Sequence, residues 1–115
     1  QRIKTPLSVN MIEEYAFYQC YVLVEAILST TSITEIRESV FSHCRSLQTV
    51  SLPNSLERIG DFAFEDCSCL VTVTVHLDAQ SIEIGDKSFY DCSALANFVL
   101  PQGSNAKSNS FGECA

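Results

Sequence analysis

The chain has 115 residues, enough for a single domain over residues 1–115, and its 46% hydrophobic content supports a continuous core. Its 14 acidic residues outnumber its 7 basic ones. This balance argues against a nucleic-acid partner, because a phosphate-binding surface needs clustered lysine and arginine. The sequence also has no apolar run of about 18 residues, the length that would indicate a membrane span.

A short motif, Phe-x-x-Cys, recurs five times. The steps between successive cysteines are 24, 23, 25 and 22 residues. The five copies are Phe17/Cys20, Phe41/Cys44, Phe64/Cys67, Phe89/Cys92 and Phe111/Cys114. A period near 23 is typical of a solenoid, in which each turn stacks on the next and function usually depends on an exposed surface. We therefore expect about five turns.

Each copy predicts the same elements in the same order. In the clearest copy, apolar residues alternate over residues 47–52, which predicts a short strand, and Pro53 marks the turn after it. A second extended piece is expected over residues 56–59 and a helical turn over residues 61–67. The apolar strand positions of the four full copies are Ala26 and Leu28, Val50 and Leu52, Val73 and Val75, Phe98 and Leu100. One continuous core is expected to bury the five phenylalanines together with Ile12, Ile36, Ile59 and Ile84.

The segment from Cys44 to Cys67, CRSLQTVSLPNSLERIGDFAFEDC, resembles the BspA-like class of leucine-rich repeat, and the segment IEIGDKSFYDCSALANFVLP from Ile82 supports the resemblance. The chain departs from the family pattern near its ends, at Tyr21-Val22 and at Ala106. The resemblance implies relatives that are mostly secreted or surface proteins of anaerobic bacteria and parasitic protists. In these proteins the repeats are implicated in adhesion to host matrix proteins, cells or other microbes.

The predicted architecture is an α/β leucine-rich-repeat solenoid with parallel strands on one wall and short helical turns on another. Its handedness should be right, as for parallel crossovers generally. Because Gln1 is not an initiator methionine and Cys114-Ala115 stops within a repeat, we expect a fragment of a longer protein.

The strand wall is the predicted binding surface. Twelve residues should point outward from it, and eleven of them are uncharged: Val24, Glu25, Ile27, Gln48, Thr49, Ser51, Val71, Thr72, Thr74, Ala96, Asn97 and Val99. The predicted contacts with a protein partner are Glu25, Gln48, Thr49, Ser51, Val71, Thr72, Thr74, Asn97 and Val99. A mildly apolar, uncharged patch is typical of a protein-binding sheet. The alternative is that short β-branched residues only fill a parallel sheet.

Acidic residues also recur, three before the Phe (Glu14, Glu38, Asp61, Asp86) and two after it (Asp66, Asp91, Glu113). Stacked carboxylates could hold calcium through oxygen ligands. We favour a structural role, because a carboxylate at the start of a helical turn caps free N–H groups and complements the helix dipole. No metal or cofactor is therefore predicted.

The six cysteines permit several interpretations. An even count fits disulfides, Cys67-x-Cys69 with His43 and His76 in other repeats weakly resembles a zinc site, and a catalytic thiol would need a histidine partner. We favour buried free thiols, because five of the six occupy one repeated position that follows an inward phenylalanine. Cys69 stands outside this series and should differ.

Tyr15, Tyr18 and Phe62 fall in the expected helical turns. They could form a second, convex patch, although the favoured interpretation is that they lie flat over neighbouring turns.

The sequence favours a protein-binding module of a cell-surface or secreted protein, acting in adhesion, with a host extracellular-matrix protein among the candidate partners. The alternative is an intracellular interaction scaffold, which would suit free thiols in a reducing compartment. Catalysis is not predicted, because no acid, base and nucleophile converge in the repeat.

Overall fold

The computed structural model describes residues 2–4, 11–75, 80–107 and 109–112. Within these ranges the chain forms eight short strands and no helix. The strands are β1 (Arg2–Lys4), β2 (Glu25–Ile27), β3 (Glu35–Ile36), β4 (Thr49–Ser51), β5 (Arg58–Ile59), β6 (Thr72–Thr74), β7 (Glu83–Ile84) and β8 (Asn105–Ala106). Since these ranges contain no helix, none of them provides a helix that could cross a membrane.

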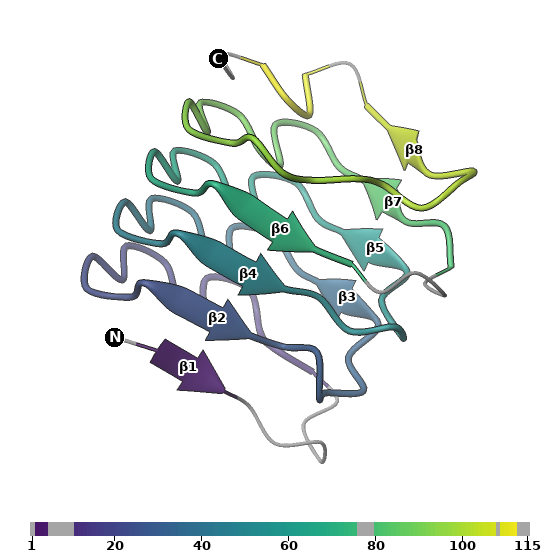
Figure 1. The fold of residues 1–115 in the computed structure, drawn as a ribbon, viewed down its shortest axis with the longest axis horizontal. Helices are drawn as coiled ribbons and strands as arrows, with labels where there is room; N and C mark the ends of the chain where they lie inside the picture. The colour runs from purple at the N-terminus through teal and green to yellow at the C-terminus, as the bar shows by residue number, and fades with distance from the viewer. Residues whose placement is uncertain (1, 5–10, 76–79, 108, 113–115) are drawn as a thin grey trace.

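The strands form two parallel sheets, visible in Figure 1 as two rows of stacked arrows. The front sheet has the order β1-β2-β4-β6 and the back sheet the order β3-β5-β7-β8. Along the chain the strands alternate between the two sheets, so each turn of the solenoid supplies one strand to each. The predicted solenoid with parallel strands is confirmed.

Within the described residues three turns give a strand to both sheets: β2 with β3, β4 with β5, and β6 with β7. This corrects the expectation of about five turns. In the fourth copy the predicted strand is reduced to one parallel bridge, Thr72 to Asn97. The departure from the family pattern at Ala106 coincides with an exposed strand, β8.

The core follows the predicted register. Ala26, Val50 and Val73 are the buried middle residues of β2, β4 and β6, and their neighbours on both sides are more exposed. The predicted isoleucines Ile12, Ile36, Ile59 and Ile84 are all buried. The period-two pattern of the sequence therefore placed the inner and outer faces of these strands correctly.

The five repeated phenylalanines form one continuous stack through the molecule. Neighbouring rings are nearly parallel, at 5 to 8°, with centroids 5.0 to 5.3 Å apart. The three middle rings, Phe41, Phe64 and Phe89, are fully buried, whereas Phe17 and Phe111 at the two ends are partly buried. Each inner ring thus contacts an identical ring above and below, in addition to the apolar core.

The expected helical turns are wrong. In their place lie segments of consecutive tight turns, residues 13–20, 37–44, 60–67 and 85–92, which we call the turn ridge; they line the left side of Figure 1. In the first segment, Ala16, Tyr18 and Cys20 donate their N–H groups to carbonyls three residues earlier. The alternate N–H groups, of Tyr15, Phe17 and Gln19, donate to carbonyls of the next turn. An α-helix would use all of these donors within itself, so it could not bind the neighbouring turn.

This pattern requires unusual backbone angles. Among the described residues eight non-glycine residues have φ between 53 and 61°, and all lie two residues before or after a repeated phenylalanine. They are Tyr15, Gln19, Ser39, His43, Phe62, Asp66, Lys87 and Asp91. Such left-handed residues cannot belong to a right-handed helix. The predicted α/β class is therefore corrected to an all-β solenoid for the described residues.

Removing a ring from the middle of the stack should be costly. We expect Phe64→Ala to reduce the free energy of unfolding by roughly 3 to 5 kcal/mol, because it leaves a cavity and takes a partner from two rings. Urea denaturation would measure the change. Phe17→Ala is the matched control and should cost clearly less, since Phe17 is partly exposed and has one stacking partner. Equal losses for both variants would show that the stack does not contribute as described.

Candidate functional site

The outer face of the front sheet holds most of the predicted contact residues in two straight rows. Strand register aligns Glu25 with Thr49 and Thr72, and the bridge adds Asn97 to this first row. The second row contains Ile27, Ser51 and Thr74. Asn97 Nδ2 donates to Thr72 Oγ1 at 3.4 Å, which joins neighbouring turns along the first row. These residues are partly or fully exposed, so they form one continuous outer face.

Gln48 and Val71 extend this face on the side where the strands begin. The N–H of Val71 donates to the carbonyl of Gln48, so their turns are held together at this level. Val99 lies apart from the two rows, beyond the bridge at Asn97, and is 85% exposed. The structure thus brings eight of the nine predicted residues onto one face and places Val99 at its far end.

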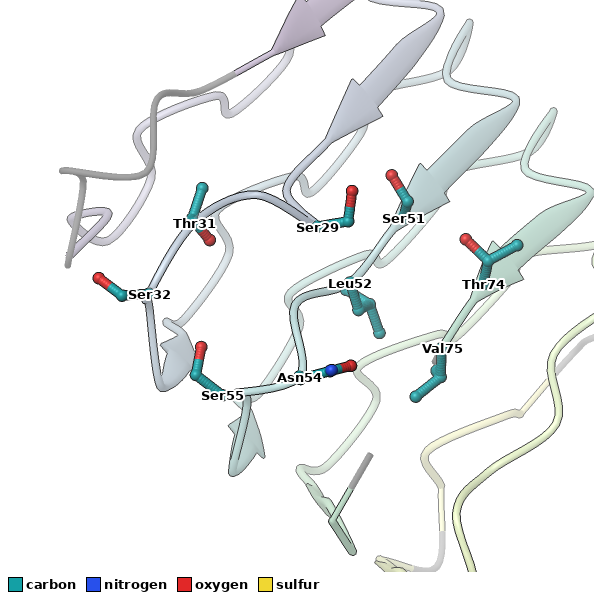
Figure 2. Close-up of a pocket in the computed structure, with 9 residues that line it drawn as sticks. All are labelled: Ser29, Thr31, Ser32, Ser51, Leu52, Asn54, Ser55, Thr74 and Val75. Atoms are coloured by element: carbon teal, nitrogen blue, oxygen red, sulfur yellow. The ribbon is translucent and has the colours of Figure 1, made fainter. Parts of the chain in front are cut away.

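Two shallow hollows border this face. One, of about 470 Å³, is lined partly by Thr72, Thr74, Asn97 and Val99. The other, of about 530 Å³, lies where the front strands end, and Figure 2 shows that residues from three successive turns surround it. Its lining residues carry hydroxyl, amide or apolar side chains: Ser29, Thr31, Ser32, Ser51, Leu52, Asn54, Ser55, Thr74 and Val75. Sequence reasoning missed this second hollow, although the polar residues after each predicted strand were its visible signal.

The back sheet differs from the front sheet in charge. Its strand register aligns Glu35, Arg58 and Glu83, so charges alternate along it. Arg58 Nε lies 3.8 Å from Glu35 Oε2, and Arg58 Nη2 lies 3.9 Å from Asp61 Oδ1. On the front sheet the charged residues of the two rows lie at one end, since β1 places Arg2 next to Glu25 and Lys4 next to Ile27. The positions of the rows on β4, β6 and the bridge at Asn97 carry no charge. In the turns of β4 and β6 the back sheet therefore carries charge, at Arg58 and Glu83, whereas the front rows present polar but uncharged groups.

The repeated cysteines have a structural role. Cys44, Cys67 and Cys92 are buried, and each thiol donates to the carbonyl of the phenylalanine one turn earlier, at 3.0 to 3.1 Å. Burial raises the pKa of Cys44 to about 11 and that of Cys67 well above its ordinary value. A thiol with such a pKa stays protonated and is not an activated nucleophile.

The prediction of free thiols is confirmed for the described cysteines: Cys20, Cys44, Cys67, Cys69 and Cys92. Cys69 is exposed, as expected from its place outside the series. Cys114 and His76 lie outside the described residues.

The acidic residues of the turn ridge take roles other than the predicted helix caps. Asp61 Oδ1 accepts a hydrogen bond from the N–H of Asp86 in the next turn at 2.9 Å. Asp66 Oδ2 accepts bonds from Arg45 and contacts His43 Nδ1, each at 2.9 Å. Among the described residues no three His, Cys, Asp or Glu side chains are placed to hold a metal ion.

Asp66 is the most strongly held charge of the ridge. Desolvation raises its pKa, but hydrogen bonds from His43 and Arg45 lower it by more, so the pKa lies below its usual value. Because His43 and Arg45 belong to the preceding turn, this carboxylate joins two turns.

Comparison with known proteins decides the family. Residues 1–115 match the family model described as BspA type leucine rich repeat region, in six copies. The chain belongs to this family. As a leucine-rich-repeat module of the BspA type, it is of a kind that generally mediates protein interaction. The match confirms the resemblance seen in the sequence.

Two solved structures share the fold of this BspA-type chain. A leucine-rich repeat protein from Bacteroides ovatus ATCC 8483 is 31% identical, with a TM-score of 0.72 over 84% of this chain and 24% of that one. A leucine rich cell surface protein from Faecalibacterium prausnitzii A2-165 is 23% identical, with a TM-score of 0.53 over 94% of this chain and 41% of that one. The chain thus spans less than half the length of either protein. A search of curated protein sequences gave no match.

The interactions of Asp66 should make stability depend on pH. A carboxylate whose pKa is lower in the folded state stabilises the fold above its unfolded pKa and loses this contribution as pH falls through the folded pKa. We expect Asp66→Asn to lower the melting temperature at pH 7 and to lower it much less near pH 3. Melting curves of both proteins over this range would measure the effect. Asp91→Asn is the control, because Asp91 is an exposed carboxylate at the same repeat position. If the melting temperature of Asp66→Asn were below that of the natural chain by the same amount at every pH, the prediction would be contradicted.

The thiols should differ sharply in reactivity. In native protein at neutral pH we expect a thiol-specific reagent to modify Cys69 rapidly and to leave Cys44, Cys67 and Cys92 unmodified, because these three are buried and their thiols donate to backbone carbonyls. After denaturation all six cysteines should react. Cys69→Ser, as control, should abolish the fast phase. Rapid reaction of the variant, or fewer than six thiols in denatured protein, would contradict the assignment.

Proposed function

We propose that this chain is a protein-binding module that acts through the outer face of the front sheet. The observation that carries the proposal is the uncharged stretch of the front rows over β4, β6 and the bridge at Asn97, in the turns where the back strands β5 and β7 carry Arg58 and Glu83. A surface with few charges loses little on desolvation, and depletion of charge is typical of interface centres. The proposed contacts are Glu25, Gln48, Thr49, Ser51, Val71, Thr72, Thr74, Asn97 and Val99.

We further propose that the parent protein is displayed at the cell surface or secreted and that the module is adhesive, with host extracellular-matrix proteins as candidate partners. The related Faecalibacterium protein is described as a cell surface protein, which supports this proposal. The free thiols do not favour an intracellular scaffold, because Cys44, Cys67 and Cys92 are reduced as donors to backbone carbonyls within the fold.

Charge placed at the centre of the face should block binding. We expect Thr72→Lys with Thr74→Glu to weaken binding to a matrix protein by about tenfold or more, because a buried unpaired charge at an interface is costly. Thermal stability should change little, by about 0.5 kcal/mol at most, since both side chains are at the surface. Surface plasmon resonance against a panel of immobilised extracellular-matrix proteins would measure the affinities.

The matched control is Thr34→Lys with Asn105→Glu, which places the same two charges at exposed positions next to or within the back sheet. This variant should bind as the natural chain does. Equal binding by the front-sheet variant would refute the assignment of the site, and lack of binding to every matrix protein would refute the adhesive role.

A further inference from the structure

A second surface lies on the turn ridge of the first turn. Tyr15, Tyr18 and Tyr21 are spaced three residues apart and are 52%, 39% and 49% exposed. The rings of Tyr15 and Tyr18 meet edge to face with centroids 5.4 Å apart, so they form one aromatic surface. Grouped exposed aromatic rings are uncommon on a surface that meets only water.

Residues of the next two turns hold these rings in place. The ring of Tyr18 contacts the ring of His43 edge to face at 5.5 Å, and the guanidinium of Arg45 lies over the ring of Tyr21 at 5.9 Å. Asp66, one turn further on, binds both His43 and Arg45. The rings are therefore positioned before any partner arrives, which lowers the entropy cost of binding. We call these six residues, Tyr15, Tyr18, Tyr21, His43, Arg45 and Asp66, the tyrosine patch.

The repeat itself does not need these tyrosines. The residues at the same repeat positions as Tyr15 and Tyr18 in the next turn are Ser39 and Ser42, which are buried within a well-packed ridge. Since serine satisfies the fold at these positions, the two rings are not required to fill the ridge. Tyrosine and arginine are also the residue types that most often dominate binding energy at interfaces.

The charges around the patch indicate the partner. The first three ridge segments, together with Tyr21 and Arg45 that directly follow the first two, contain six carboxylates and two guanidinium groups. One of these guanidinium groups, that of Arg45, is already bound to Asp66. Glu13, Glu14 and Glu38 are exposed; the first two directly precede Tyr15 in the chain, and the carbonyl of Glu38 accepts a hydrogen bond from the N–H of Tyr15. Such a surface repels an acidic partner and attracts a basic one.

We propose that the tyrosine patch binds a lysine- or arginine-rich segment of a partner protein. Basic side chains would lie over the exposed faces of Tyr15 and Tyr18, and the surrounding glutamates would balance their charge. The fourth turn contains this kind of contact within the chain, since the ammonium of Lys87 lies over the ring of Tyr90 at 5.2 Å. This site is separate from the front sheet and does not depend on its proposed function.

The test uses two fluorescein-labelled peptides of twelve residues, one in which lysine alternates with glycine and serine and one with glutamate in place of each lysine. Fluorescence anisotropy should detect binding of the lysine peptide and none of the glutamate peptide. Tyr15→Ala with Tyr18→Ala should weaken binding by roughly five- to thirtyfold, the loss of two cation–π contacts. Tyr15→Phe with Tyr18→Phe keeps both ring faces and should bind nearly as well as the natural chain. Protection of Cys44 from a thiol reagent would verify that each variant is folded.

Two controls test whether the peptide binds at the tyrosine patch itself. Tyr90→Ala removes a ring that Lys87 already occupies and should leave binding unchanged, as should Thr72→Lys with Thr74→Glu on the front sheet. If Tyr15→Ala with Tyr18→Ala bound the lysine peptide with unchanged affinity, the peptide would be attracted by the net charge of the chain alone, and the proposal would be overturned. Sedimentation without peptide tests for self-association. Self-association of the natural chain that Tyr15→Ala with Tyr18→Ala abolishes would also overturn the proposal, because it would identify a second copy as the partner.

Discussion

The structure depends on backbone hydrogen bonds between neighbouring turns. Along the ridge every second N–H group donates to the next turn, as the bonds from Phe17 to Val40 and from Phe41 to Ala63 show, at 2.9 and 2.8 Å. A single turn would leave these donors without partners, and unpaired buried backbone groups are costly, so each turn requires a neighbour. The stacked rings and the thiol-to-carbonyl bonds repeat at the same spacing as these bonds. One turn-to-turn distance therefore satisfies the backbone, the rings and the thiols together.

The same bonds explain how the ridge tolerates strained residues. A non-glycine residue with positive φ costs on the order of 1 kcal/mol or more, and the described ridge has eight of them. In the second segment the left-handed residues Ser39 and His43 both donate N–H groups to the next turn. The left-handed conformation points these N–H groups out of their own segment and toward the next turn. The resulting hydrogen bonds and the packing between turns offset the cost of the strain.

The sequence predicted what each turn does alone and missed what depends on its neighbours. The inward residues follow a local period, so the burial of Ile36, Phe64 and Val50 could be predicted from one turn. The ridge could not, because a segment of seven residues with a small residue, a phenylalanine and a cysteine fits a helical turn as well as a series of tight turns. Left-handed Tyr15 and Phe62 have no marker in the sequence, since glycine or asparagine would be the usual sign. The sequence suggested a convex patch with Tyr15 and Tyr18 but missed His43, Arg45 and Asp66, because these residues come from the next two turns and meet the rings only when three turns are aligned.

Stacking restricts the inner residues and leaves the outer ones free, so the outer residues distinguish one turn from another. The front sheet and the ridge are different sides of each turn, and each of these sides aligns several turns next to one another (Figure 1). In a solenoid the terminal turns open at the lowest cost, because each has a neighbour on one side only. Asp66 already ties the first turn, through His43 and Arg45, to the third. A ligand that binds only the closed arrangement stabilises it by mass action, so any partner spanning these turns also stabilises the stacking of the first turn on the second and third.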